Sequence, residues 1–352
     1  MLYIKLKRIF MLKNFDNHEF LNGQNFSNIA NVIFAINVPN EDLINFNLDD
    51  YKIISKNKEF TGLKLRNLSI KNGDIVFCNS SYLNLFFKYL KRLKQITSIT
   101  LITSQSDFSI TKKVFINKPE SVTKWFAVNV AHKDSCLIPI PLGLANNYSP
   151  KNIRINDLVN FKFEKVKKEN KLYVNLRKST NYKERENIEN LFKNKEWVVL
   201  KEPNLSIDEY IKDLNKYKFI LCPWGNGFDT HRIWEALYCG SIPVTKSHIG
   251  LSFEDLPIVS FEGFDNLSID KLIAKSNEKD FNTYPLNLKY WDQLIKKDIN
   301  LTNRISESIK EISYIEFLFW NRIKVISFIF SKSKIVKFYI KKVIEKLNNL
   351  FQ

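Results

Sequence analysis

The chain has 352 residues, which is more than one typical hydrophobic core accommodates and a suitable length for two domains of ordinary size. Its hydrophobic content of 44% and aromatic content of 14% allow substantial cores and exclude an intrinsically disordered protein. The net charge of +17 indicates an anionic partner, such as nucleic acid, acidic lipid or a phosphorylated substrate, and charge alone does not choose among them.

Cysteine usage and the amino terminus predict a cytoplasmic protein. The four cysteines (Cys78, Cys136, Cys222 and Cys239) form no CxxC pair and lie in apolar contexts, which favours reduced core thiols over a metal site or a disulfide framework. Residues 1–15 alternate apolar and basic residues and lack the apolar core and cleavage site of a signal peptide. No run approaches the roughly 20 apolar residues that span a bilayer.

Short apolar and β-branched runs in the first half of the chain predict the strands of one sheet. Between them, apolar residues at helical spacing predict a helix over residues 80–93. We therefore expect an amino-terminal Rossmann-like domain over residues 1–150, followed by a polar linker over 151–170 with one small helix. The predicted strands cover residues 32–38, 74–79, 98–104, 124–130 and 136–143.

The second half repeats the alternation of strands and helices, and we expect a second Rossmann-like domain over residues 171–312. Continuous apolar strands that alternate with helices are typical of a parallel sheet covered on both faces. Two such blocks predict an α/β fold in which two Rossmann-like domains face a cleft, with ligands at the carboxyl ends of the strands. The predicted strands cover 171–177, 197–202, 219–225, 241–247 and 256–262, and the predicted helices cover 182–194, 206–217 and 229–240.

Residues 313–352 are expected to form a basic amphipathic helical tail. Between Arg322 and Lys346 there are eight Lys or Arg and one acid, Glu345, while apolar residues keep helical spacing. Such a helix can lie in an anionic membrane surface. The alternative is a helix that packs against the body and exposes a solvated basic face.

A glycine turn follows the predicted strand over residues 219–225. Gly225 and Gly227, on either side of Asn226, permit unusual backbone angles and the close approach of a ligand. Asp229 is a suitable N-cap for a helix that begins near Thr230. The free N–H groups and the positive dipole end of that helix would form an anion site at the edge of the sheet.

Two cations stand in the first turn of this predicted helix. His231 and Arg232 are unfavourable there for the helix itself, and a bound anion would relieve that cost. Glu235 lies on the same face one turn later and could accept hydrogen bonds from sugar hydroxyls. The pattern therefore suits a diphosphate above the helix and a sugar against Glu235. The alternatives are an ordinary turn and a surface ion pair between Arg232 and Glu235.

The string GNGFDTHRIWEALYCGSIPV resembles the donor-site motif of exostosin-like glycosyltransferases, the family 47 type with the GT-B arrangement of two Rossmann-like domains. The resemblance covers the second half well and extends weakly into the first half, which would be the acceptor side. It implies transfer of a sugar from a nucleotide-sugar donor to a hydroxyl, with inversion and without an essential metal or other cofactor. It also implies that Glu235 binds donor hydroxyls, and that Arg232 and the amides after Gly227 hold the pyrophosphate.

An inverting transfer needs a general base beside the acceptor hydroxyl, and two residues are candidates. Asp107 follows an apolar strand in the string Ser-Gln-Ser-Asp, where related proteins carry His-Asn-Ser-Asp. Its alternative role is to cap the next segment. His132 also follows an apolar strand and titrates in a useful range. Asn129 and Asn146 in flanking loops could orient acceptor hydroxyls.

Arg177 and Lys178 follow the first predicted strand of the second half. From that position either cation could stabilise the leaving diphosphate electrostatically and take the place of a metal ion. The sequence contains no D-x-D motif, and Asp49-Asp50 lies in a polar stretch that is a poor substitute. We therefore expect no metal.

These observations together predict a glycosyltransferase that acts on a glycan or glycolipid acceptor in cell-surface synthesis, such as capsule or lipopolysaccharide. It would lie on the cytoplasmic, inner face of the cell membrane through the basic tail. Within the enzyme class, the alternatives are a fucosyltransferase-like enzyme with a GDP-sugar and a nucleotide-sugar epimerase. A basic module that binds nucleic acid or a membrane is the alternative from another class, and we expect no nucleic-acid partner.

Overall fold

The computed structural model describes residues 15–310, except 165, 254, 279–281, 298 and 300–304. The described residues up to Ile309 form one compact unit that contains a seven-stranded and a five-stranded sheet. The predicted α/β fold with two Rossmann-like domains is confirmed, and the residue boundaries of those domains stay a prediction. The predicted tail over 313–352 lies outside the described residues. In the part of the chain that is described, no helix is long and apolar enough to cross a membrane.

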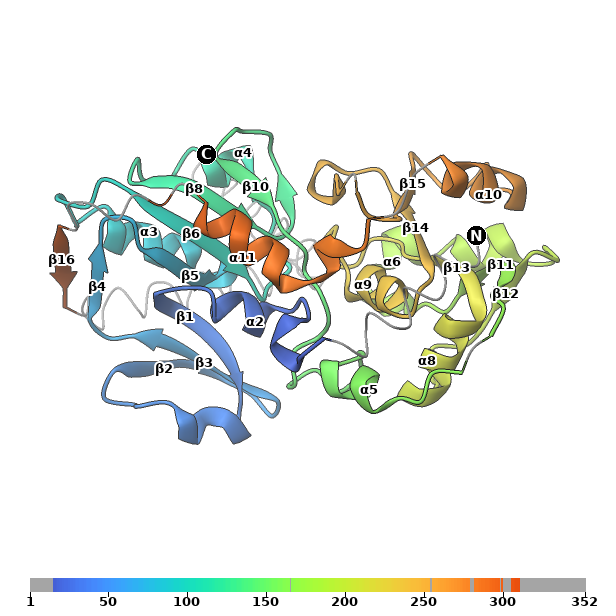
Figure 1. Cartoon of the computed structure of the whole chain (residues 1–352), viewed down its shortest axis with the longest axis horizontal. Helices are drawn as coiled ribbons and strands as arrows, with labels where there is room; N and C mark the ends of the chain where they lie inside the picture. The colour runs from blue at the N-terminus through green and yellow to red at the C-terminus, as the bar shows by residue number, and fades with distance from the viewer. Residues whose placement is uncertain are drawn as a thin grey trace, which may run out of the picture. The chain divides into compact units, whose positions relative to one another are not determined.

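The first sheet has the strand order β10-β8-β6-β5-β1-β3-β2 (Figure 1). Strands β1, β5, β6, β8 and β10 are parallel, and each overlaps one of the five predicted strands. Their carboxyl ends therefore meet at one edge of the sheet. The five strands are β1 (Val32–Pro39), β5 (Ile75–Asn79), β6 (Ile99–Ser104), β8 (Val122–Ala127) and β10 (Leu137–Pro139).

An antiparallel hairpin, β2 (Tyr51–Lys56) and β3 (Phe60–Leu65), extends the sheet beyond β1 and was not predicted. Strand β2 is half-exposed along its length and carries lysines, so it lacks the continuous apolar run of a central strand. Strand β4 (Leu68–Lys71) pairs antiparallel with β16 (Ser306–Ile309), which joins two segments far apart in the sequence. A pairing between such distant segments cannot be recognised from the local sequence of either strand.

Aromatic side chains connect the first sheet to its helices. On α3 (Leu83–Leu90), Phe86 and Tyr89 lie 5.1 and 5.3 Å from the ring of Phe34 in β1. Trp291 of α11 (Leu288–Lys296) lies 6.5 Å from Phe26 of α2 (Gly23–Ser27). The helix predicted over 80–93 is confirmed as α3 with a preceding 3-10 turn, η3 (Ser80–Tyr82).

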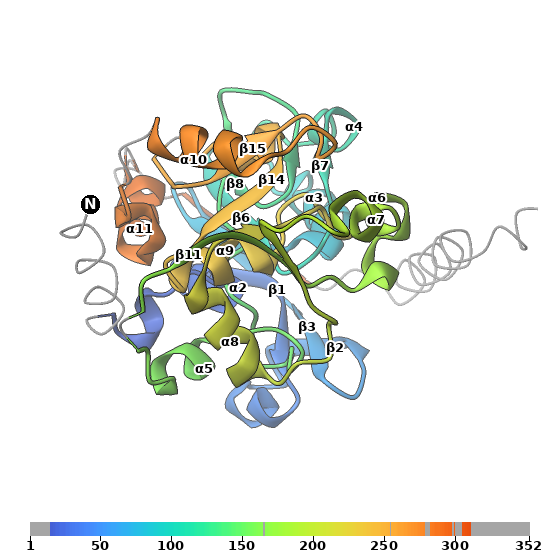
Figure 2. The ribbon, with the colours of Figure 1, turned by 90° about the vertical axis from the view of Figure 1, so that its right-hand side faces the viewer.

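The second sheet is wholly parallel, with the order β12-β11-β13-β14-β15 (Figure 1). Strands β11, β14 and β15 of this sheet are labelled in Figure 2. Along β13, Phe219 and Leu221 pack on one side, and Ile220 packs on the other, so both faces are buried. The predicted continuous apolar strands are thereby confirmed. The strands are β11 (Glu169–Val174), β12 (Val198–Leu200), β13 (Tyr217–Leu221), β14 (Ile242–Lys246) and β15 (Val259–Phe261).

Helices cover both faces of this sheet. The helix predicted over 182–194 is instead two short helices, α6 (Tyr182–Arg185) and α7 (Ile188–Phe192). The small helix in the linker is confirmed as α5 (Ile155–Asn160). Helix α8 (Ile207–Lys216) begins with a capping box in which Ser206 and Glu209 bond to each other's backbone N–H. The remaining helices are α9 (His231–Tyr238) and α10 (Ile269–Asn277).

One lysine joins the carboxyl ends of α8 and α9. The Lys168 ammonium donates to the carbonyl oxygens of Leu214, Asn215 and Cys239 at 3.0, 2.6 and 3.0 Å, and to the Ser241 hydroxyl at 2.8 Å. These carbonyls lack partners within their own helices, and a cation is favourable at the negative end of a helix dipole. Lys168 therefore fixes α9 against α8 from the end opposite the site described below.

Replacing Lys168 with Met should lower the free energy of unfolding by about 2 kcal/mol, because hydrogen bonds to a charged group are lost and buried carbonyls lose a partner. Denaturant unfolding followed by circular dichroism would measure the change. The matched control is Lys167→Met at the exposed neighbouring position, which should unfold like the unmodified protein. Equal midpoints for the two variants would contradict this role of Lys168.

Candidate active site

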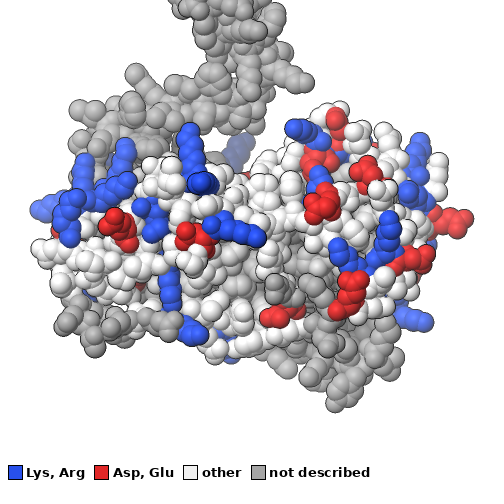
Figure 3. Space-filling model, turned by 90° about the horizontal axis from the view of Figure 1, so that it is seen from above, with Lys and Arg blue, Asp and Glu red and all other residues white. Residues whose placement is uncertain are grey.

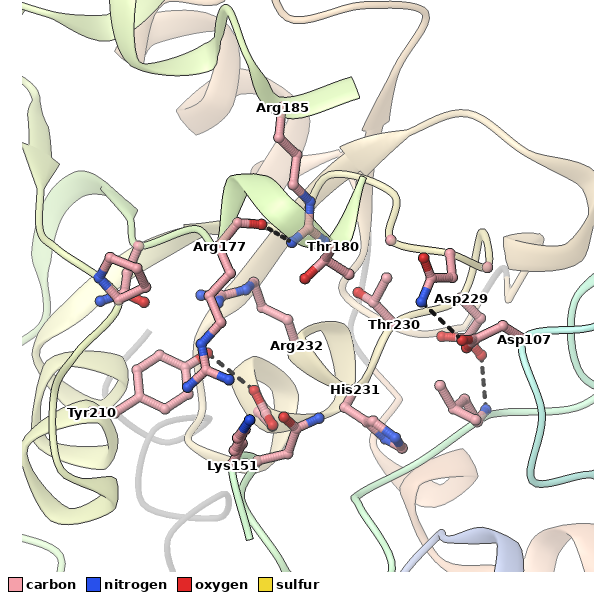
Figure 4. Close-up of a pocket in the computed structure, with 18 of the residues that line it drawn as sticks. Asp107, Lys151, Arg177, Thr180, Arg185, Tyr210, Asp229, Thr230, His231 and Arg232 are labelled. Atoms are coloured by element: carbon pink, nitrogen blue, oxygen red, sulfur yellow. Dashed lines mark hydrogen bonds between the residues drawn. The ribbon is translucent and has the colours of Figure 1, made fainter. Parts of the chain in front are cut away.

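A cavity of about 320 Å³ lies at the amino-terminal end of α9 (Figure 4). The loop after β11, helix α6, the start of α8 and the turn before α9 form most of its wall. The first half of the chain contributes Asp107, Leu142, Lys151 and Asn152. The cavity therefore lies at the carboxyl ends of parallel strands, where open α/β sheets bind ligands.

The glycine turn before α9 is shaped by a side chain from the first half of the chain. A Cβ on Gly227 would lie 2.7 Å from both the Nδ2 and Oδ1 atoms of Asn129, whereas a Cβ on Gly225 would find its nearest atom at 3.4 Å. Among the described glycines, those with positive φ are Gly73, Gly143 and Gly240. The predicted unusual backbone angles at Gly225 and Gly227 are thus wrong, and Gly227 is needed for the close approach of Asn129.

Asp229 lines the cavity but does not cap the helix as predicted. The N-cap is Thr230, whose side chain makes no capping bond. The Asp229 carboxylate is buried and accepts hydrogen bonds from Leu142 N and Trp234 Nε1, both at 2.7 Å. Its backbone N–H donates to Asn129 Oδ1 at 3.0 Å. Burial raises the pKa of Asp229 to about 7, although both donors favour the ionised form.

His231 and Glu235 bond from α9 to backbone groups of the preceding half of the chain. His231 Nδ1 lies 2.8 Å from the carbonyl oxygen of Gly143, so Nδ1 carries the hydrogen and Nε2 does not when the ring is neutral. Glu235 is buried and accepts from Ile153 N at 3.2 Å and from the Tyr210 hydroxyl at 3.0 Å. Each side chain lines the cavity and also holds α9 in place.

Two guanidinium groups give the cavity its positive charge. Arg232 lies 5.3 Å from the Tyr210 ring, and its buried Nη1 has no partner in the described part of the chain. Arg185 is buried and donates to the carbonyls of Trp224, Arg177 and Pro223 at 3.1, 3.1 and 3.3 Å. Burial and the nearby Arg232 lower the pKa of Arg185 to about 10. Two cations that disfavour each other in this way are suited to an anionic ligand.

Arg177 and Lys178 were both predicted at this site, and they lie in different places. Arg177 is exposed and lines the cavity. Lys178 is bonded to the carboxylate of Glu189 at 2.5 Å and lines a second cavity of about 390 Å³ beside the ends of β11 and β12. Thr230 also lines the cavity, and its buried hydroxyl has no partner among the described residues.

The two candidate bases are also separated. Asp107 lines the cavity, and its Oδ2 accepts a hydrogen bond from Asn226 Nδ2 at 3.2 Å. His132 does not line the cavity, and its ring lies 5.0 Å from that of Phe115. Asn129 is buried beneath the glycine turn rather than placed to orient an acceptor.

Several residues of the cavity were not predicted from the sequence. Tyr210 lies on α8 and stacks under Arg232, and Lys151 and Asn152 come from the segment that was predicted to be a linker. Arg185 on α6 also lines the cavity and was not among the predicted site residues. A signal was present for Tyr210, because it lies one turn into a helix with a strong capping box. No local signal places Lys151 at this cavity.

One group of metal-ligating side chains is found in the described part of the chain. It consists of Asp16, His18 and Glu19 and does not line the cavity. Glu19 is ion-paired with Lys289 and accepts from Asn287 Nδ2 at 3.1 Å. These partners lower the pKa of Glu19, chiefly through the hydrogen bond from Lys289. The group is explained as part of the contact between η1 (Asn17–Glu19) and α11.

The structure is that of an α/β protein with a cationic cavity at the strand ends of two parallel-rich sheets, and such a cavity is suited to an anionic ligand. Residues 161–251 match the family model described as the RXYLT1 C-terminal domain. RXYLT1 is ribitol xylosyltransferase, and its family is a family of glycosyltransferases. The match includes Arg177, Arg185 and Arg232, and Asp107 lies outside it. A search among curated proteins found no match. The protein is a glycosyltransferase, as predicted, with a sugar donor and an acceptor as its substrates.

The buried carboxyl of Asp229 should make stability depend on pH. Its pKa is about 7 when folded and 3.8 ordinarily, so the folded protein keeps a proton that the unfolded chain loses. The stabilisation is fully present below about pH 4 and is lost as pH rises through about 7, at up to about 1.4 kcal/mol per pH unit. Denaturant unfolding at several pH values should show this slope, and Asp229→Asn should remove it.

The matched control for this prediction is Asp265→Asn, which changes an exposed carboxylate in the same half of the chain. This variant should keep the pH dependence of the unmodified protein. A slope that is the same in all three proteins would show that the Asp229 carboxyl titrates in the folded state as it does in the unfolded chain.

Proposed function

We propose that the protein transfers a sugar from a nucleoside diphosphate-sugar to a hydroxyl of a glycan or glycolipid, with inversion. The observation that carries this proposal is the group of Arg177, Arg185 and Arg232 around the amino-terminal end of α9. A guanidinium group can donate two parallel hydrogen bonds to phosphate oxygens. The free N–H groups at the start of a helix also favour a negatively charged ligand. The buried Nη1 of Arg232 would gain a partner when a diphosphate binds.

The donor would span the cavity from an apolar to a polar side. Pro203, Leu205 and Ile207 provide the apolar wall that a nucleoside ring needs. The diphosphate would lie at Arg232 and Arg177, and the sugar hydroxyls near Glu235, whose oxygens have accepting capacity beyond two hydrogen bonds.

We propose that catalysis needs no metal and no other cofactor. The leaving nucleoside diphosphate gains negative charge as the bond to the sugar breaks. Arg177, Arg185 and Arg232 would stabilise that charge directly, which is the role that a divalent ion has in other transferases.

Asp107 is the proposed general base. Its carboxylate would take the proton from the acceptor hydroxyl while the oxygen attacks the anomeric carbon, and the nucleoside diphosphate would leave with the bonding electron pair. Asn226 donates to one Asp107 oxygen at 3.2 Å and would orient the other toward the acceptor. His132 is the weaker candidate because it lies outside the cavity.

The donor sugar is proposed to be a pentose. The matching family model belongs to a ribitol xylosyltransferase, which by its name transfers xylose to ribitol. We extend this to a pentose donor and a hydroxyl-rich acceptor here. The resemblance of residues 225–244 to the exostosin-like, family 47 type is compatible with that proposal.

Two alternatives give different expectations. A fucosyltransferase-like enzyme would bind GDP in preference to UDP. A nucleic-acid module would need a continuous basic surface, but in Figure 3 acidic side chains are interspersed with basic ones on the face shown. The cavity at α9 favours a nucleotide-sugar over a polymer.

The cellular setting remains a proposal from the sequence. Synthesis of capsule, lipopolysaccharide or another cell-surface polysaccharide on the inner face of the membrane would place the basic residues of 313–352 against anionic lipid.

Arg177→Ala should weaken UDP binding about tenfold, which is about 1.4 kcal/mol, because a phosphate contact is lost. Titration calorimetry would measure this, in EDTA to keep divalent ions out. Lys178→Ala is the matched control, since Lys178 is the exposed neighbour that does not line the cavity. Stronger binding of GDP than of UDP would favour the fucosyltransferase-like alternative, and equal losses in both variants would contradict the assignment.

Asp107→Asn should reduce kcat for transfer by about 100-fold or more, because an amide cannot accept the acceptor's proton. His132→Ala should leave kcat within about twofold. Both are measured from the rate of nucleotide release with a hydroxyl acceptor present. A large effect of His132→Ala with none of Asp107→Asn would reverse the assignment of the base.

A further inference from the structure

Polar side chains gather at the carboxyl ends of β1, β5 and β6 in the first sheet. The three strands are adjacent and parallel, and Asn79 and Ser104 are paired in register at their ends. Asn37, near the end of β1, joins the same edge through Gln105, which follows β6. The Gln105 side chain accepts from Asn37 N at 3.0 Å and donates to its carbonyl at 3.4 Å.

Two atoms at this edge lack hydrogen-bond partners among the residues that the structure describes. Asn37 Oδ1 and Ser104 Oγ are buried and have no partner in the described part of the chain. Leaving a buried acceptor or hydroxyl unpaired costs roughly 1–3 kcal/mol, so such atoms are uncommon without a functional reason. Both atoms lie at one edge of the sheet, where the surrounding side chains form hydrogen bonds with neighbouring strands.

Further hydroxyl groups and aromatic rings lie beside Asn37. A Cβ on Gly62 would lie 2.2 Å from Ser55 Oγ, 3.0 Å from the Tyr82 hydroxyl and 3.2 Å from Asn37 Oδ1, so glycine allows these polar atoms to lie close together. The hydroxyls of Ser55 and Tyr82 are 3.0 Å apart. Tyr148 accepts from Asn146 Nδ2 at 2.9 Å, and its ring lies 5.1 Å from that of Phe60.

This polar edge leads directly to the proposed base. Gln105 has a positive φ of 62°, which directs the chain around a tight bend toward Asp107, two residues later. Between them, the Ser106 hydroxyl accepts from that of Ser81 at 2.8 Å. A ligand on the polar edge would therefore present one end to Asp107.

The chemistry of the edge differs from that of the cavity at α9. The described hydrogen bonds of Asn37, Gln105 and Tyr148 all join neutral groups. Amides, hydroxyls and aromatic rings recognise the hydroxyls and C–H faces of sugars and polyols, and none of them compensates a phosphate or carboxylate charge.

We propose that Asn37, Gln105 and Tyr148 form a subsite for the acceptor, and that the part bound there is an uncharged, hydroxyl-bearing sugar or polyol. Its reacting hydroxyl lies toward Asp107. Asn37 Oδ1 and Ser104 Oγ gain partners from the ligand. This inference rests on the proposed function and adds the place and the chemical class of the acceptor.

The test uses the full chain with UDP present and saturation-transfer NMR. The probes are ribitol, methyl β-D-xylopyranoside, methyl β-D-glucopyranoside and ribitol 5-phosphate. At least one neutral probe should give a signal that falls about tenfold in Asn37→Ala. The control Asn84→Ala, an exposed amide on α3, should retain it. Tyr148→Phe keeps the ring and should weaken the signal with less risk to folding.

The outcomes separate this inference from the proposed function. Calorimetry with UDP on each variant should give an unchanged affinity, and absent UDP binding in the unmodified protein would count against the donor site instead. With UDP bound, the acceptor subsite is overturned if no neutral probe binds, if the signal persists in both Asn37→Ala and Tyr148→Phe, or if ribitol 5-phosphate alone binds.

Discussion

The candidate site depends on the way helix α9 is fixed to backbone groups of the preceding part of the chain. Four polar side chains in or just before this helix reach the preceding part of the chain. Each bonds to a main-chain atom between Leu21 and Ile153. The pairs are Asp229 with Leu142 N, His231 with Gly143 O, Glu235 with Ile153 N, and Tyr238 with Leu21 N. All four contacts are buried or part-buried, so they are shielded from competition by water.

This anchoring determines what the first turn of α9 can do. A helix that begins with two cations has an unfavourable amino-terminal charge. Here the side-chain bonds of Asp229 and Glu235 and the cap by Lys168 at the other end hold the helix in place despite that charge. Arg232 therefore stays in the cavity with one nitrogen that has no partner among the described residues. These contacts hold Arg232 in a fixed position, in which it would be preorganised for the proposed anionic donor.

The sequence predicted the fold and the turn before α9 better than the hydrogen-bond partners of individual residues. Continuous apolar strands and helical spacing are local signals, and they correctly indicated both parallel sheets and the turn before α9. The half-exposed strand β2 and the pairing of β4 with β16 lack such signals. The helix predicted over 182–194 is interrupted after Arg185. The Arg185 guanidinium donates hydrogen bonds to three backbone carbonyls outside this helix.

Roles within the site were harder to predict, because the decisive partners are distant in the sequence. Asp229 bonds to a backbone group 87 positions away and Glu235 to one 82 positions away. The local pattern predicts a helix cap at Asp229 and a ligand-facing carboxylate at Glu235. In the folded chain, both carboxylates instead accept hydrogen bonds from distant backbone N–H groups. Gly227 follows the same rule, since the atom that excludes a side chain there belongs to Asn129. Among the residues that follow a strand, Asp107 and Arg177 line the cavity as expected, whereas His132 and Lys178 do not.

Charge is divided between the two sides of the site, and this division has a physical consequence. Arg177, Arg185 and Arg232 surround the amino-terminal end of α9, whereas Asn37, Gln105 and Tyr148 are bonded to neutral groups. Asp107 and Asn226 meet where the two sides join. The guanidinium groups are suited to the negative charge of a diphosphate, and the neutral amides and hydroxyls are suited to uncharged hydroxyl groups. The charged donor and the neutral acceptor would therefore bind on opposite sides of the contact between Asp107 and Asn226.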